Sequence, residues 1–455
     1  MTLEKKWNYS WIFFIFVLVL HFICVCYFSV NVPCWDEWEP LRQGGMTRQF
    51  DWNWILSFHT ENRHATSQFL TWLFLKFDNW NLKHQIIFNG IMYISSVLIY
   101  LRGFQKMLKI KLTDTSLWWF PLVFSLMFSP QMEENHLWGW QANYLFGFFF
   151  LTIALWSFSI LQQRKAPFVL FASLVLASYS ISFALIISLF IAAGVLLHLF
   201  FNQFWQDRFR FFNWVLGYLF FSYAIFYWFQ GRPPSAEAPS QIQWLEWFKH
   251  WLGILSLPIG NHTHTYYLTG LITLCGIAVL IWKIISQLFK KQVSVGNDLA
   301  SAGLTSQDQV KKNRLPYLCF FAGTLATTLI ISLSRHRFGA QQAFASRYFI
   351  FAFMLIPFLC FLWLAITDNL VSFAKAKKYS FYISTFIFLG FLNDWSYSAY
   401  ASTREARLQQ RACLGQHLHT KNVDCPTSYP GDLREMLDRA IELDVEFIQD
   451  LKNAN

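Results

Sequence analysis

The sequence predicts an all-α, polytopic membrane protein with about eleven transmembrane helices, and three observations support this fold class. Its apolar residues occur in blocks of about 17 to 22, long enough to cross roughly 30 Å of hydrocarbon. The chain is 55% hydrophobic and only 14% charged, whereas ordinary soluble domains carry about 25% charged residues. Lysine and arginine also gather in alternate connecting segments, which is typical of cytoplasmic loops.

The predicted spans follow one another along the chain. We place them at 11–30, 84–101, 116–129, 142–161, 167–180, 182–201, 213–229, 267–287, 315–333, 347–367 and 379–396. The first span follows Lys5 and Lys6, as the apolar region of a signal peptide would. Its apolar region is longer than that of a signal peptide, and no small-residue cleavage site precedes Cys34. We therefore expect it to remain as a transmembrane helix.

The net charge of +10 follows the predicted topology. With a cytoplasmic N-terminus, the dense basic clusters all fall in inside segments, as the positive-inside rule requires. These clusters are Lys106/Lys109/Lys111, Arg164/Lys165, Arg208/Arg210, Lys290/Lys291, Lys311/Lys312/Arg314 and Lys375/Lys377/Lys378. The basic character is explained by topology, and a nucleic-acid partner is not expected.

Two external segments of the predicted transmembrane domain, 1–396, are too long to be simple turns. The first, 31–83, contains "SQFLTWLFLKF", and the second, 230–266, contains "IQWLEWFKHWLGILSL". Both stretches are amphipathic, and the first is too short to span the bilayer. We therefore expect external helices at the membrane surface.

A charged C-terminal tail, 397–455, forms the third external segment. We predict helices in it from about Ser402 to His417 and from Gly431 to Leu443. Cys413 and Cys425 both fall in this tail, where a disulfide can persist. The sequence is compatible with a bonded pair and with two free thiols, and no Cys/His spacing resembles a zinc site.

The longest inside segment, 288–314, is rich in Ser, Gly, Gln and Asp and has no apolar periodicity. We expect it to be a flexible cytoplasmic linker. Neither GxxxxGK[ST] nor GxGxxG occurs in this or any other inside segment, so the sequence offers no nucleotide site to drive transport.

Polar residues that are unusual for a membrane protein occur in five short stretches, all external in this topology. They are "CWDEWEP", "FHTENRH", "QMEENHLWGWQ", "GNHTHTYY" and "SRHRFGAQQAFASRY". Acidic residues come early in the chain, whereas the last stretch supplies Arg335, Arg337 and Arg347. This order suits a site with a base on one wall and an anion-binding group on another.

Each stretch also has a simpler interpretation. Asp36 and Glu37 are compatible with solvated loop acids, and the "ENRH" group with a salt-bridged cap before a helix. Glu133 and Glu134 are suited to capping or ending spans, and the three arginines to snorkelling toward lipid headgroups. The two histidines of "NHTHT" are typical of a solvated loop. The location of all five stretches on one face favours a functional site.

These side chains suit group transfer from a lipid-linked donor. A carboxylate at the membrane interface can accept a proton from an acceptor hydroxyl as a general base. Arginine can hold a phosphate or pyrophosphate leaving group through paired hydrogen bonds and stabilise its growing charge. This chemistry requires no cofactor, and a divalent metal is compatible with it.

An acidic pair directly after the first span resembles the signature of the GT-C superfamily of membrane glycosyltransferases, which use polyprenyl-phosphate sugars. More narrowly, "CWDEW", "ENRH", "ENHLWGWQ" and "RFGAQQAFASRY" are similar to motifs of a group of bacterial multi-span membrane proteins. Those motifs are of the types DDW/DEW, NEHR, EN-x-x-WG-x-Q and R-x-G-x-x-x-A-x-x-SRY. The tail stretch "YPGDLREMLDRAIELDVEFI" resembles their closing segment, whereas "ENRH" departs from the NEHR order.

The resemblance implies a catalytic pair in which Asp36 is the general base and Glu37 its neighbour or a metal contact. It further implies that the arginines face the donor phosphate. The implied substrate-binding residues are Glu61, Arg63, His64, Glu134, Gln141, Arg335, His336, Arg337 and Arg347. It also implies a multi-pass protein of the bacterial inner membrane, with a cytoplasmic N-terminus and a periplasmic tail.

We therefore expect an inverting glycosyltransferase that moves a sugar from a polyprenyl-phosphate donor to a cell-envelope glycan or lipid. One alternative is an O-antigen polymerase or ligase, which also uses external arginines and histidines but concentrates them in one large late loop. Another is a flippase for lipid-linked oligosaccharides or a different transporter. A transporter predicts ionisable residues in the middle of spans, where this sequence has few.

Overall fold

The computed structural model describes residues 3–108, 120–158, 166–201, 208–233, 242–257, 267–279, 315–355, 396–420, 425 and 433–453, without residues 61, 339 and 352–353. These residues are almost all helical. The β-structure among them is one hairpin, in which β1 (Phe58–His59) pairs antiparallel with β2 (Asn62–Arg63). The all-α fold class is confirmed, while the predicted linker 288–314 lies outside the described residues.

Six of the described helices are long and apolar enough to cross a membrane. They are α1 (Leu3–Phe28), α4 (Leu82–Leu108), α7 (Ala142–Phe158), α9 (Ser182–Phe201), α10 (Arg208–Phe229) and α14 (Leu315–Arg335). Two shorter apolar helices are α8 (Ala166–Ser178) and Tyr267–Val279. All eight coincide with predicted spans, and the chain has the helices of a multi-span membrane protein.

The remaining predicted spans are described only in part. Of 116–129, the described residues form the short helix α5 (Phe120–Ser125) and the 3-10 turn η3 (Leu126–Phe128). Predicted span 347–367 begins in the 3-10 turn η9 (Ser346–Tyr348) and then leaves the described residues after position 355. Predicted span 379–396 lies outside them apart from its last residue.

Aromatic side chains fill the centre of the bundle, where α4 packs on α7 and α9 packs on α14. The ring of Tyr100 lies with its centroid 4.7 to 5.9 Å from those of Phe104, Phe124, Phe148 and Phe320. Such edge-to-face pairs stabilise beyond their buried area. In contrast, only 28% of the most apolar window of α1 and 22% of that of α10 is buried. Large apolar surfaces of this kind suit contact with lipid.

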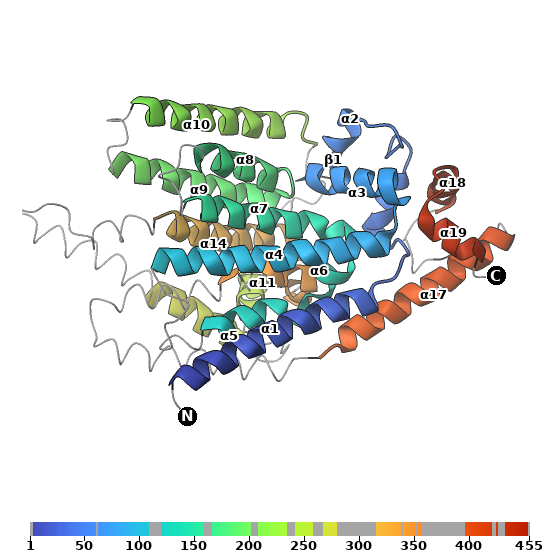
Figure 1. Cartoon of the computed structure of the whole chain (residues 1–455), viewed down its shortest axis with the longest axis horizontal. Helices are drawn as coiled ribbons and strands as arrows, with labels where there is room; N and C mark the ends of the chain where they lie inside the picture. Colours follow the sequence, from blue (N-terminus) through green and yellow to red (C-terminus); the bar gives the residue numbers. More distant parts are fainter. Residues whose placement is uncertain are drawn as a thin grey trace, which may run out of the picture.

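The elements that do not belong to the apolar bundle gather at one of its ends (Figure 1). The N-terminus of α1 lies at the opposite end. The gathered elements are α2 (Trp52–Ile55), α3 (Ala65–Asp78), the β-hairpin, α17 (Ser398–Thr420), α18 (Arg434–Glu442) and α19 (Glu446–Asn453). The first external loop and the C-terminal tail therefore share one end of the molecule.

The tail contains both predicted helices, as α17 and α18, and a third one, α19, that the sequence analysis did not identify. Phe447 of α19 packs its ring against those of Trp38 and Trp80, with centroids 5.6 and 6.4 Å apart. Cys413 and Cys425 form a disulfide. The tail is thus folded onto the first loop and cross-linked within itself.

Both amphipathic stretches form helices, but α11 (Trp244–Ser256) does not lie flat on the bundle end. Next to its start, Gln243 N donates to His336 Nε2 at 3.3 Å, just beyond the end of α14. Further along, Trp251 Nε1 donates to Thr328 Oγ1 at 3.1 Å, about two turns back along α14. The last turns of α11 are buried in the bundle core. This helix therefore enters the bundle beside α14.

Candidate functional site

Two of the polar stretches are joined where α6 (Glu133–Leu137) meets η9. The backbone N–H of Glu134 donates to Ser346 Oγ at 3.2 Å, and Asn135 Nδ2 donates to Ser346 O at 3.1 Å. In return, Arg347 N donates to Glu134 Oε2 at 3.3 Å. The "ENHLWGWQ" and "SRY" segments therefore hold each other in place, although more than 200 residues separate them.

Arg347 lies at the centre of this junction and is partly open to solvent. Its Nε lies 3.6 Å from Glu134 Oε2, and the two side chains are 30% and 22% exposed. Burial acts to lower the pKa of Arg347, but Glu134 and, more weakly, Asp36 favour its charged form, and the pKa ends above its ordinary value. A fixed guanidinium with an open side is suited to binding an oxyanion.

A second arginine, Arg335, comes from the C-terminal end of α14. Both Arg335 and Arg347 lie within electrostatic range of Tyr348, and the guanidinium carbon of Arg347 lies 5.8 Å from the centre of the Tyr348 ring. Arg337 is exposed, and its guanidinium carbon lies 4.8 Å from the centre of the Phe338 ring. The structure thus groups Arg335 with Arg347.

Glu133, at the start of α6, is a carboxyl group with an unusual proton affinity. Burial and then the neighbouring charge of Glu134 raise its pKa to about 7, although a hydrogen bond with Ser346 opposes the shift. A carboxyl group that titrates near neutrality can act as an acid or a base under physiological conditions. Glu133 belongs to the polar stretch "QMEENHLWGWQ", but it is not among the site residues predicted from the sequence.

Asp36 is presented by the 3-10 turn η1 (Trp35–Leu41), and it is half-buried. The residue before it, Trp35, is 46% exposed and has a φ of 52°. A bulky residue with positive φ is strained, and such strain is concentrated at functional sites. The turn therefore presents Asp36 in a conformation that the surrounding structure must maintain.

Glu37, directly after Asp36, is enclosed. Its side chain is 1% exposed, and its Oε2 lies 2.6 Å from Arg407 Nη1. The same carboxylate accepts hydrogen bonds from Cys34 N at 2.8 Å and from Gly139 N at 2.6 Å. Removing one partner of such a buried pair costs about 3–5 kcal/mol because the other charge is left uncompensated. Glu37 is thus fully used by protein contacts.

Gly139 is a position at which the chain must come close to this carboxylate. A Cβ on Gly139 would lie 3.3 Å from Glu37 Oε1 and 2.6 Å from Leu82 Cδ1. The absence of a side chain lets the backbone N–H reach Glu37. This contact gives the glycine of the "WGWQ" stretch a structural reason and joins a third polar stretch, "CWDEWEP", to the other two.

Arg407 is the residue of this region that the sequence analysis missed. It lies on α17, and its side chain is 4% exposed. Burial acts to lower its pKa, but the charge of Glu37 outweighs burial and leaves the pKa raised. One signal was present: Tyr400, Arg407, Gln410 and Leu414 are all buried and share one face of a helix by their spacing. Because the predicted helix is rich in charged residues, its sequence did not indicate that an arginine would lie on its buried face.

His64 belongs to a second group of polar residues, next to the first. Its Nδ1 lies 3.1 Å from Ser180 O and 3.2 Å from Asn143 Nδ2. The ring of Trp140 has its centroid 5.7 Å from that of His64 and 5.1 Å from that of His59. Burial lowers the pKa of His64 to about 3, so the imidazole is neutral near pH 7. This histidine is a hydrogen-bonding group and carries no charge.

Arg63 is used inside the protein. Its Nε donates to Trp228 O at 3.2 Å, its Nη2 to Gln230 O at 2.7 Å, and its Nη1 to Leu56 O. Two of these acceptors lie at the C-terminal end of α10, where a cation is favoured by the helix dipole. The simpler interpretation of the "ENRH" stretch, a cap, describes Arg63 well, although the helix it caps is α10.

The other candidate residues lie in different surroundings. His336 is buried. Its Nε2 accepts a hydrogen bond from Gln243 N, and its Nδ1 lies 2.9 Å from Leu333 O. Gln141 is buried, and its Oε1 has no hydrogen-bond partner among the described residues. Glu61, His262 and His264 lie outside the described residues. The structure therefore pairs Glu134 with Arg347, places Asp36 and Arg335 within electrostatic range of this junction, and leaves Arg63 and His336 in structural contacts.

A metal was considered compatible with the site from the sequence. Within the described part of the chain, no group of three or more His, Cys, Asp or Glu side chains is arranged to hold a metal ion.

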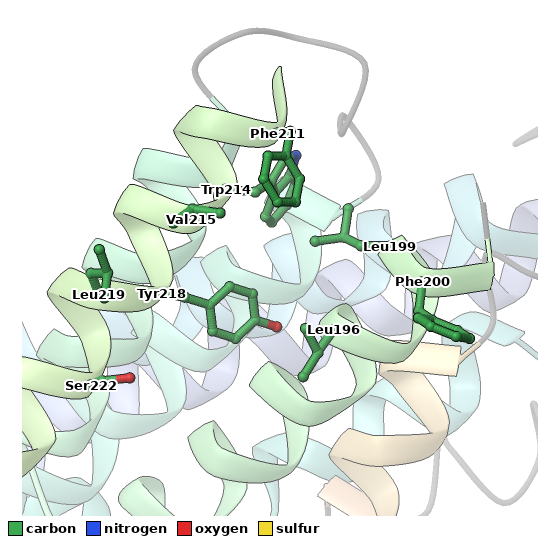
Figure 2. A pocket seen from close by; sticks show the side chains of 9 residues that line it. All are labelled: Leu196, Leu199, Phe200, Phe211, Trp214, Val215, Tyr218, Leu219 and Ser222. Carbon is green, nitrogen blue, oxygen red and sulfur yellow. The ribbon is translucent and has the colours of Figure 1, made fainter. Parts of the chain in front are cut away.

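An apolar hollow of about 400 Å³ lies between α9 and α10. Figure 2 shows the side chains that line it, among them Trp214, Tyr218 and Leu196. Leu196 belongs to the far half of α9, away from Ser180 and His64. This hollow offers hardly any polar group for catalysis, and it suits an apolar chain.

Comparisons with known proteins give no relative from which a function could be carried over. No family model, no curated protein and no solved structure matches the chain.

Proposed function

We propose that the chain is a membrane glycosyltransferase that transfers a sugar from a polyprenyl-phosphate donor to a cell-envelope glycan or lipid acceptor. The observation that carries this proposal is the position of Arg347, partly open and within electrostatic range of both Glu134 and Asp36. A carboxylate and a phosphate-binding cation are the two groups that an inverting transfer from a lipid phosphate needs.

In the proposed reaction, Asp36 accepts the proton of the acceptor hydroxyl, and the acceptor oxygen attacks the anomeric carbon. The bond between that carbon and the donor phosphate oxygen breaks, and both electrons leave with the phosphate. Arg347 and Arg335 receive the growing negative charge. The new bond forms on the face opposite to the leaving group, so the anomeric configuration is inverted.

The two acids of the "CWDEWEP" stretch take different roles in this proposal. Glu37 is occupied by Arg407, Cys34 and Gly139, and it fixes the turn. Asp36 remains half-buried at the open side, and we assign the base to it. Glu133 adds a group whose charge changes near pH 7, and it hydrogen-bonds with Ser346, the residue before Arg347.

The proposal includes an orientation. The end of the bundle that carries the first loop and the tail faces the periplasm of a bacterial inner membrane, and the N-terminus faces the cytoplasm. This orientation gives the site access to lipid-linked sugars and to acceptors in the cell envelope, and it is supported by the positions of the basic clusters in the sequence.

The test is the Asp36→Asn variant, with sugar transfer from a radiolabelled polyprenyl-phosphate sugar measured in membranes at matched expression. Loss of the base is expected to lower the rate by about 10²-fold or more. Glu39→Gln is the matched control, because Glu39 belongs to the same turn and pairs with Arg42 at 3.1 Å. Equal transfer by Asp36→Asn and wild type would refute the assignment. A transporter would move lipid across the membrane without forming a glycosidic bond.

A further inference from the structure

The turn that carries Asp36 has a backbone conformation that it would not adopt alone. Trp35 has a φ of 52°, in the left-handed region, where a large side chain is unfavourable. Cys34, before it, is extended, and the 3-10 turn begins directly afterwards. A strained residue persists only where neighbouring contacts determine the conformation. The contacts that hold Trp35 therefore also fix Asp36.

Glu37 supplies the contact that closes this turn. Its Oε2 accepts the N–H of Cys34 at 2.8 Å, and the backbone N–H of Glu37 donates to Cys34 O at 3.1 Å. These two hydrogen bonds join the residues on either side of Trp35 and Asp36. The other oxygen of Glu37 accepts the N–H of Gly139, so the turn is fixed to the segment that follows α6.

Arg407 holds this carboxylate from the C-terminal tail, 370 positions later in the chain. Its Nη1 contacts Glu37 Oε2 and also donates to Val32 O, while its Nη2 lies 3.5 Å from Leu137 O. One guanidinium thus joins the chain before the turn, the turn itself and the end of α6. Arginine suits this place because its donors are fixed in a plane and point in several directions.

We propose that Arg407 is a positioning residue for the catalytic turn, through which the C-terminal tail fixes Asp36 against the α6–η9 junction. The effect on catalysis rests on the function proposed above, whereas the effect on the turn does not. Because Arg407 touches no substrate, its role is to keep the oxygen of Asp36 at the distance from Arg347 at which acceptor and phosphate fit together. Small displacements of positioned groups are costly in catalysis.

The test compares Arg407→Lys with Arg411→Lys in the full-length protein in detergent or nanodiscs. Lysine retains the charge but cannot reach Val32, Glu37 and Leu137 at once. Arg411 lies one turn further along α17 and donates to Asp450 O at 3.4 Å, so it is a matched control. The measurements are hydrogen exchange of the amides in residues 34–41, thermal unfolding, and kcat and donor KM.

Arg407→Lys is expected to speed exchange in 34–41 at least tenfold while amides in α4 and α9 stay protected. It is also expected to lower kcat at least tenfold, with donor KM within twofold, because the phosphate-binding arginines stay in place. Arg411→Lys should match wild type in both. A folded Arg407→Lys protein with wild-type exchange in 34–41 and wild-type kcat would overturn the proposal.

If Arg407→Lys does not accumulate, Glu37→Gln tests the same contact from the other side. Glutamine keeps the shape and one acceptor oxygen, but it cannot accept all three hydrogen bonds. The same local increase in exchange is expected, and its absence would again contradict the proposal. Failure of the proposed function gives a different result: the wild-type protein would transfer no sugar, while faster exchange in 34–41 would still follow the loss of Arg407.

Discussion

Glu133 makes the stability of the protein depend on pH. Its pKa is raised from 4.5 to about 7, so the folded state favours the neutral acid. The stabilisation from this group is complete below the unfolded pKa and is lost as pH rises through the folded value. We expect the unfolding temperature of the solubilised protein to fall between about pH 5 and about pH 8. A pKa raised from 4.5 to about 7 corresponds to roughly 3 kcal/mol, since one pK unit is worth about 1.4 kcal/mol.

Glu133→Gln identifies the group responsible. Glutamine is neutral at every pH, so this part of the pH dependence is expected to disappear while the fold is kept. Donor KM gives a second measurement: in wild type it should rise as Glu133 becomes charged beside Glu134 and Ser346 of the phosphate-binding junction, and in Glu133→Gln it should not. A pH dependence that is unchanged in Glu133→Gln would assign the effect to another residue.

Asp36 and Glu37 show how far the sequence could lead at the residue scale. Both are carboxylates in one short external stretch, and nothing in the local pattern separates them. The two acids have different roles because Arg407 pairs with Glu37 and leaves Asp36 on the open side. A partner so distant in the chain cannot be found from local periodicity. The sequence therefore predicted an acidic site but not which acid is structural and which is the candidate base.

At the element scale, the disulfide of the tail is expected to stabilise the helix that carries Arg407. Cys413 lies on α17, and Cys425 lies 12 positions later. Closing a loop of this length restricts the unfolded chain and contributes about 3 kcal/mol. Reduction with dithiothreitol is therefore expected to lower the unfolding temperature of wild type, measured by the loss of helical circular dichroism.

The Cys413→Ser/Cys425→Ser double variant is the control for that experiment. It should unfold at the temperature of the reduced wild type and should not respond to the reductant. Cys34 is buried and has a free thiol, and it should become reactive only when α17 loosens, because Gln410 Nε2 lies 3.4 Å from its sulfur. An unfolding temperature that is the same with and without reductant would show that the disulfide does not stabilise the tail.

Helices with long apolar or amphipathic sequences were predicted well from the sequence, whereas the short helix α19 was not. Apolar blocks located all eight apolar helices of the described residues, because hydrophobic length is a local property. The short helix α19 was missed, although Phe447, Ile448 and Leu451 have helical spacing and are buried. For α11, the amphipathic pattern predicted the helix but not its direction. That direction is decided by partners on α14, such as Thr328 for Trp251.

For the whole molecule, the sequence predicted that the polar stretches share one face, and the contacts between them show how they are joined. The decisive hydrogen bonds connect residues that are 102, 213 and 370 positions apart. Each pairs a carboxylate with a backbone N–H or an arginine on another element. The charge pattern can place such groups on the same side, but it does not determine which acid meets which donor.

That shared face leads to a prediction about the membrane orientation of the whole chain. Gln49, in the loop between η1 and α2, and Lys452, in α19, are both exposed. Helices α2 and α19 lie at the end of the bundle opposite the N-terminus (Figure 1). Arg102, near the C-terminal end of α4, is exposed at the other end of that helix. In the proposed orientation, a membrane-impermeant maleimide should label Gln49→Cys and Lys452→Cys in cells with a permeabilised outer membrane.

Arg102→Cys should be labelled only after the inner membrane is opened, with the unsubstituted chain giving the background from its own free thiols. The disulfide of the tail provides independent support, because an oxidising compartment must surround residues 413 and 425 for it to persist. Labelling of Gln49→Cys and Lys452→Cys from different sides would contradict the fold, since α18 packs on η1. If only Arg102→Cys were labelled in cells with an intact inner membrane, the fold would stand but the proposed orientation would be reversed. Asp36 would then lie on the cytoplasmic side, without access to envelope acceptors.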